Sequence, residues 1–182
     1  MEGSKESNTE RLLWKLDSSH QAKSFYSLSY ILLSGQQQLA RLSFTGKRNV
    51  NAPEADCEYG QKHIHFAQKS ALSFKVVVSD SDTGEQVALL IPSKIHSKAE
   101  IEFPIGMKYY ATKKGILHIK LEISDETDRR LCEFQSVNLE SSDYNFNALD
   151  IRSTDPELIL LSILSFYLHE CIGYNGHSGR GY

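Results

Sequence analysis

The sequence has 182 residues, a length that is typical of one domain and short for two. Apolar residues make up 40% of the chain and charged residues 24%, so a substantial hydrophobic core is expected. The formal net charge is −3, with 20 Lys and Arg against 23 Asp and Glu, and this balance argues against general nucleic-acid binding, which needs a basic excess.

The first ten residues, MEGSKESNTE, are polar and contain no apolar core segment, which predicts a tail without a signal peptide. The stretch RLLWKLDSS that follows fits a helical turn or a first strand, because its apolar residues do not decide between the two periods. We therefore assign residues 1–23 to a polar tail and a short leading segment. No CxxC motif occurs, and the cysteines are few and widely spaced, which favours reduced thiols and a cytoplasmic location: Cys57, Cys132 and Cys171.

From Ser24 onward, short runs of apolar and aromatic residues alternate with polar ones, which predicts β-strands. Two such runs flank Ser34-Gly35, a pattern typical of a hairpin. Residues 47–61, KRNVNAPEADCEYGQ, are polar and are predicted to form a long loop. The whole pattern indicates about nine or ten strands joined mostly by short turns, forming a sheet with one dry face and one wet face.

Near the end of the chain, the stretch STDPELILLSILSFYLHECIGYNG predicts one helix over residues 156–172. Asp155 suits the N-cap position, Pro156 the first helical position and Gly173 the C-terminal stop. Apolar residues surround the axis on all sides, so the helix must be buried on all sides. Its apolar run is too short to cross a bilayer, which needs ~20 residues, so no transmembrane span is expected.

A flat sheet would cover one side of this helix, whereas a sheet curled around it would cover every side. An eight-stranded barrel has room only for side chains, so a barrel that contains a helix needs more strands. We therefore predict a mainly β fold, a closed antiparallel β-barrel of about ten to twelve strands wrapped around one apolar C-terminal α-helix. The barrel domain is expected over residues 24–174, followed by a disordered tail at 175–182.

The many short antiparallel strands, the mid-chain hairpin VVVSDSDTGEQVALL and the segment TDPELILL before one apolar helix resemble the tubby C-terminal-like group. This group includes tubby-like proteins, phospholipid scramblases and plant LURP-one-related proteins. The resemblance is one of pattern and spans residues 24–174. It implies a closed barrel of about twelve strands around a C-terminal helix. In tubby-like members it also implies phosphoinositide binding through basic surface residues.

Two motifs suggest metal binding, and we interpret both as structural. His63-x-His65 would place two imidazoles on one face of a strand, with Cys57 nearby, but a zinc site needs further ligands and none is evident. The turn DSDTG that begins at Asp80 resembles the start of a calcium loop. The twelfth residue of that loop, however, is Ile91 where a calcium loop has glutamate. We predict no metal site.

The sequence indicates no catalytic site. Cys171 with His169 and Glu170 suggests a thiol catalyst, but residues one and two apart on a helix do not face each other. No nucleotide-binding, nucleophile-elbow or zinc-protease motif occurs in the chain. We therefore expect a protein that is not an enzyme and has no cofactor.

The candidate site is a set of basic residues that would gather on one end of the barrel and hold phosphate head groups. Three of them alternate along an extended segment, two sit in a predicted hairpin turn, and one lies nearby: Lys94, His96, Lys98, Lys113, Lys114 and Lys108. The competing interpretation is a set of ordinary solvated strand faces and turns, neutralised by Glu100 and Glu102.

These observations indicate a non-catalytic binding module that recognises anionic membrane lipid or a protein partner and lies in the cytoplasm or peripherally at a membrane. Two alternatives stay open. The barrel would bind a small apolar ligand, or the chain would be an enzyme without a recognisable motif.

Overall fold

The computed structural model describes residues 11–17, 28–45, 52–70, 73–93, 97–115, 120–137 and 143–174, the last three of these as backbone only. Within these residues, twelve strands are followed by one helix, α1 (Leu158–Tyr174). The strands are β1 (Arg11–Leu16), β2 (Ser29–Ser34), β3 (Gln37–Thr45), β4 (Glu54–Tyr59), β5 (Lys62–Gln68), β6 (Val76–Asp80), β7 (Gln86–Pro92), β8 (Lys98–Glu102), β9 (Lys108–Lys114), β10 (Lys120–Asp125), β11 (Arg130–Ser136) and β12 (Tyr144–Ala148).

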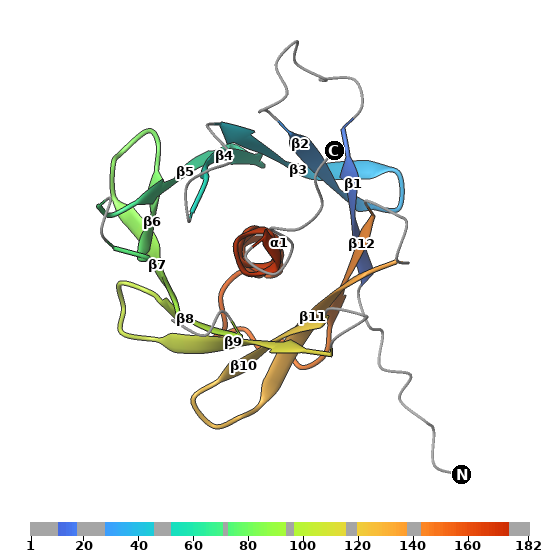
Figure 1. The fold of residues 1–182 in the computed structure, drawn as a ribbon. Coiled ribbons are helices and arrows are strands. Elements are labelled where there is room, and N and C mark those ends of the chain that lie inside the picture. Colours follow the sequence, from blue (N-terminus) through green and yellow to red (C-terminus); the bar gives the residue numbers. More distant parts are fainter. Residues whose placement is uncertain are drawn as a thin grey trace.

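The strands form a closed barrel in which each strand pairs with its neighbours in sequence, always antiparallel (Figure 1). The first strand closes the ring by pairing with the last, with Leu12 of β1 opposite Phe146 of β12. The predicted closed antiparallel barrel is therefore confirmed, at the upper end of the predicted strand number. The β2–β3 and β4–β5 hairpins each have a two-residue turn. The first residue of each turn is a glycine with a φ of 58°, Gly35 in one and Gly60 in the other.

Alternation along the strands separates the inside of the barrel from the outside. In β8, Ala99 and Ile101 are buried, while Glu100 and Glu102 lie on the outer face. The same period places buried Leu121 and Ile123 of β10 on the inner face. The inner residues of all the strands thus form one continuous apolar lining.

Figure 1 shows α1 on the axis of the barrel, surrounded by strands. Leu161, Leu164 and Phe166 are fully buried, as expected for a helix that is apolar on every side. The ring of Trp14 in β1 stacks on Phe166 with centroids 4.5 Å apart, and its Nε1 donates to Ser162 Oγ at 3.0 Å. In the part of the chain described here, no helix combines the length and the apolar character that a membrane span requires.

The barrel has two ends that differ in their relation to the helix. Because all neighbouring strands are antiparallel, the odd-numbered strands all finish at one end, which we call the distal end. The helix begins at the other, proximal end, where Glu157 Oε1 lies 2.8 Å from Nζ of Lys62, the first residue of β5. It finishes at the distal end, where the Tyr167 hydroxyl donates to the Pro53 carbonyl at 2.8 Å.

Two segments differ from the sequence-based prediction, and a third, which that prediction left open, is now assigned. The predicted loop over 47–61 is wrong in its second half, because Glu54–Tyr59 forms β4. Its acidic residues face outward and the residues between them are buried, so the strand alternates despite its low average hydrophobicity. The segment Arg11–Leu16, left open between helix and strand, is β1, and α1 lies two residues further along the chain than expected.

Candidate functional site

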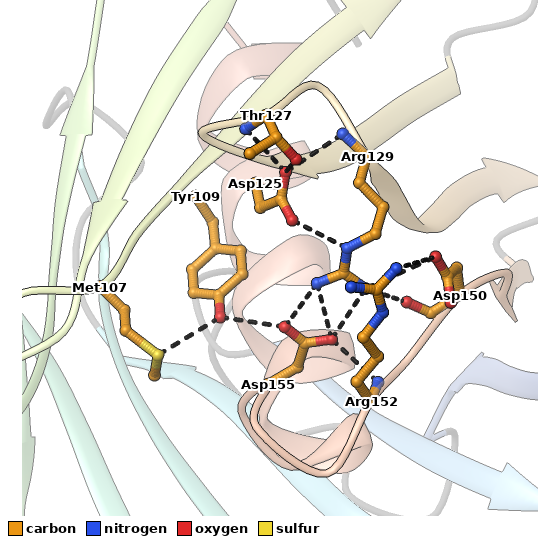
Figure 2. Close-up of polar contacts among 8 residues, drawn as sticks. All are labelled: Met107, Tyr109, Asp125, Thr127, Arg129, Asp150, Arg152 and Asp155. Atoms are coloured by element: carbon orange, nitrogen blue, oxygen red, sulfur yellow. Dashed lines mark hydrogen bonds and ion pairs between the residues drawn. The ribbon is translucent and has the colours of Figure 1, made fainter.

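A polar network at the proximal end surrounds Arg129, which lies in the turn between β10 and β11 (Figure 2). Arg129 Nη2 lies 2.8 Å from Asp155 Oδ1, and its Nη1 lies 3.0 Å from Asp155 Oδ2. On the other side, Arg129 Nε donates to Asp125 Oδ2 at 2.8 Å. The side chain of Asp155 is 4% exposed and that of Arg129 is 15% exposed, so this ion pair is largely removed from water.

Asp155 therefore does not act as the helix N-cap that the sequence suggested. The helix begins at Leu158, and its first backbone bond runs from Leu161 N–H to the carbonyl of Glu157 at 3.0 Å. The Asp155 carboxylate accepts instead from Arg129, from Arg152 N–H at 2.9 Å and from the Tyr109 hydroxyl at 3.3 Å. Burial alone would raise the pKa of Asp155, but these bonds outweigh it and lower the pKa below its usual value.

The other carboxylate of this network shapes the β10–β11 turn. Asp125 Oδ1 accepts from Thr127 N–H at 2.8 Å and from Thr127 Oγ1 at 2.7 Å. Hydrogen bonds from Thr127, followed by those from Arg129, lower the pKa of Asp125 to about 2. The network ties the segment before α1 to the strands around it, which is a structural role. This network was not predicted from the sequence, although Asp-x-Thr is a recognisable side-chain turn signal.

The predicted calcium-like turn has the same construction. Asp80 Oδ1 accepts from the N–H groups of Asp82 at 2.9 Å and Thr83 at 2.8 Å, so its lone pairs are used within the turn. These bonds, from Thr83 above all, lower the pKa of Asp80. The structural interpretation of this motif therefore agrees with its geometry.

His63 and His65 lie on the outer face of β5, each beside its own carboxylate. His65 Nδ1 is 2.7 Å from Asp56 Oδ1, and His63 Nδ1 is 3.5 Å from Asp82 Oδ2. Cys57 points into the core from β4, away from both imidazoles. Across the described ranges, no group of three or more His, Cys, Asp or Glu side chains is arranged to hold a metal ion.

None of the three cysteines forms a disulfide, and all three are buried: Cys57, Cys132 and Cys171. Burial raises the pKa of each thiol, in the case of Cys171 to about 12, so each is held in the protonated, weakly nucleophilic form. The neighbouring His169 ring packs against both Phe134 and Tyr144, with centroids at 5.0 and 4.9 Å.

Basic side chains gather at the distal end, where the odd-numbered strands finish. Within the described residues, five lysines belong to the connections and strand ends from β5 to β9, and we call them the lysine rim: Lys69, Lys75, Lys98, Lys113 and Lys114. Lys113 shares the inward-facing period of Tyr109 and Ala111 and is half-buried at the barrel mouth. The other four are exposed.

Unlike most of the other described cations, the lysines of the rim lack acidic partners among the described residues. None of its five lysines forms an ion pair with another described residue, although Lys75 exerts a small attraction on Glu102. The carboxylates nearest to Lys98 on β8 are already engaged by Lys108, whose Nζ lies 2.5 Å from Glu100 Oε1 and 2.7 Å from Glu102 Oε1. The rim is therefore a concentration of positive charge that the fold itself does not neutralise.

The predicted basic residues are divided by this arrangement. Lys98, Lys113 and Lys114 come together at the distal end. Lys98 begins strand β8, whereas Lys113 and Lys114 end strand β9 rather than lying in the predicted turn. Lys108 lies at the opposite end of β9 and is ion-paired. Lys94 and His96 fall outside the described residues. The sequence analysis missed two members of the rim, Lys69 and Lys75, which flank the β5–β6 connection.

A shallow surface groove of about 500 Å³ opens at the proximal end, between the β2–β3 hairpin and the start of α1. Apolar and polar side chains line it: Ser34, Gln37, Leu39, Glu157, Leu158 and Ile159. The carboxylate of Glu157 already pairs with Lys62. The groove therefore offers apolar side chains and no unbalanced charge from this carboxylate.

No family model, curated protein or solved structure matches this chain. The likeness to the tubby C-terminal-like group thus stays a resemblance of sequence pattern, and the site has to be interpreted from its own geometry.

Proposed function

We propose that the protein is a non-catalytic module that binds the surface of an anionic membrane through the lysine rim. The observation that carries this proposal is the concentration, at the distal end of the barrel, of five lysines that form no ion pair with any described residue. Clusters of lysine hold phosphate head groups as point charges, each contributing about 1 kcal/mol near an anionic surface. The resemblance to the tubby C-terminal-like group points in the same direction.

The proximal end supports the same orientation by its opposite charge. Its β6–β7 and β10–β11 turns, with the strand ends that lead into them, carry six acidic residues: Asp80, Asp82, Glu85, Asp125, Glu126 and Asp128. With a net charge of −3, the molecule as a whole is not attracted to an anionic surface. Attraction therefore depends on presenting the distal end to the membrane, with the acidic end facing away.

The test is co-sedimentation with vesicles of phosphatidylcholine alone and of phosphatidylcholine mixed with phosphatidylserine, at low and high salt. A variant with Lys→Ala at the four exposed rim positions should lose about 4 kcal/mol, or roughly a thousandfold in affinity. The positions are Lys69, Lys75, Lys98 and Lys114. Binding of the wild type should weaken with salt, because exposed charges are screened over about 8 Å at physiological ionic strength.

The matched control removes four cations at the proximal end by substitution with alanine: Arg11, Lys62, Arg130 and Arg152. The total charge changes by the same amount, so only the position of the lost charge differs between the two variants. The control should keep most of its binding. Equal loss in both variants, or equal retention of the wild type on neutral and anionic vesicles, would refute the proposal. An absence of binding to either vesicle at low salt would also refute it and favour a protein partner.

A further inference from the structure

Two exposed apolar side chains lie at the distal end, one within the lysine rim and one outside it. Phe74 follows Ser73 and precedes Lys75 in the β5–β6 connection, and 42% of its surface is exposed. Val137, directly after β11 and also at the distal end, is 46% exposed. Figure 1 shows β6 and β11 on different sides of the ring, so the two apolar residues are spread around the distal end.

The backbone around Phe74 is held by hydrogen bonds. Lys69 N–H donates to the Lys75 carbonyl at 2.8 Å, which joins the two ends of the connection. Lys75 N–H donates to Ser73 Oγ at 3.1 Å, and the Gln68 side-chain amide donates to the Ser73 carbonyl. Val137 is fixed similarly, by a bond from its N–H to the Asp143 carbonyl at 2.9 Å. Both side chains are thus presented from ordered strand ends, which lowers the entropy lost when they bind.

We infer that Phe74 and Val137 enter the boundary between head groups and acyl chains when the lysine rim meets an anionic bilayer. This inference rests on the proposed function and adds a second, apolar component to it. Lysines beside an exposed aromatic residue suit this boundary, because the charges remain among the head groups while the ring leaves water. The apolar component does not depend on ionic screening, so part of the binding should survive high salt.

Fluorescence provides the direct test, because the chain has a single tryptophan. Trp14 is fully buried and stacked on Phe166, so its emission forms a constant background. In a Phe74→Trp variant, phosphatidylserine-containing vesicles should shift the new emission to shorter wavelength, and lipids brominated along the upper acyl chain should quench it. Ile105→Trp is the matched control, because Ile105 is 77% exposed at the proximal end and should show neither effect.

Sedimentation of a Phe74→Ser/Val137→Ser variant gives an independent measurement. At high salt, its partition onto anionic vesicles should fall about tenfold below that of the wild type, whereas Ile105→Ser should match the wild type. Binding at low salt with no shift and no quenching for Phe74→Trp would overturn the insertion of Phe74 and leave the electrostatic proposal standing. An absence of binding at low salt would overturn both.

Discussion

Removing Arg129 should destabilise the fold far more than removing the cation beside it. The substitution Arg129→Met leaves the Asp155 carboxylate, 4% exposed, with hydrogen bonds only from Arg152 N–H and the Tyr109 hydroxyl. Loss of one partner of a buried ion pair costs about 3–5 kcal/mol, because the remaining charge stays buried. For a chain of this length, 1 kcal/mol lowers Tm by about 2–4 °C, so we expect a decrease of about 6–20 °C.

The control is Arg130→Met, which removes the same charge from the next residue. Arg130 is 61% exposed and lies 3.9 Å from Glu122 Oε1, and exposed pairs of this kind contribute at most about 1 kcal/mol. Calorimetric melts at neutral pH compare the two variants. A double variant, Arg129→Met with Asp155→Leu, should recover part of the loss, because the buried Asp155 charge is removed together with its partner and only the more exposed Asp125 loses an ion pair. Equal Tm values for Arg129→Met and Arg130→Met would refute this account of the network.

Two further predictions concern the central helix and acid sensitivity. Leu164→Asp places a charge at a fully buried position of α1 and should cost several kcal/mol, so thermal melts followed by circular dichroism should show no cooperative transition; a melt close to that of the wild type would contradict the enclosed helix. Because the pKa values of Asp125 and Asp155 are lowered on folding, the stability they contribute is present above their unfolded pKa of about 4 and is lost as the pH falls through the folded values. Between about pH 5 and pH 2, the free energy of unfolding measured with urea should therefore fall more for the wild type than for Asp155→Asn. An equal fall for both proteins would exclude this contribution of Asp155.

The architecture could be predicted because one segment constrained it. The residues of α1 are apolar in every direction, and only a barrel with enough strands encloses such a helix. Strand β4 could not be recognised in the same way, because its inward residues Ala55 and Cys57 are small and stand between charged ones. Inward and outward residues do alternate along β4, but the inward ones are too small to give a strong hydrophobic pattern.

The candidate site was less accessible from the sequence. The convergence of Lys98 with Lys113 follows from the antiparallel order of β8 and β9, which the sequence pattern suggested. Lys108 was wrongly grouped with these lysines, because β9 is long enough to place Lys108 and Lys113 at opposite ends of the strand. Lys108 instead pairs with Glu100 and Glu102. The Arg129 network joins residues from distant parts of the chain, and no local pattern marks such a meeting.

The closure of the barrel between β1 and β12 also determines when the protein can fold. Leu12 finds its partner, Phe146, only after all the strands between them have left the ribosome, and the helix that fills the interior is made later still. Until then, the apolar inner faces of the strands have nothing to enclose. Folding dominated by such distant pairings is slow, in the range of milliseconds to seconds for barrels. Newly made chains therefore pass through a period in which unpaired strand edges and the exposed core are open to aggregation and to chaperones.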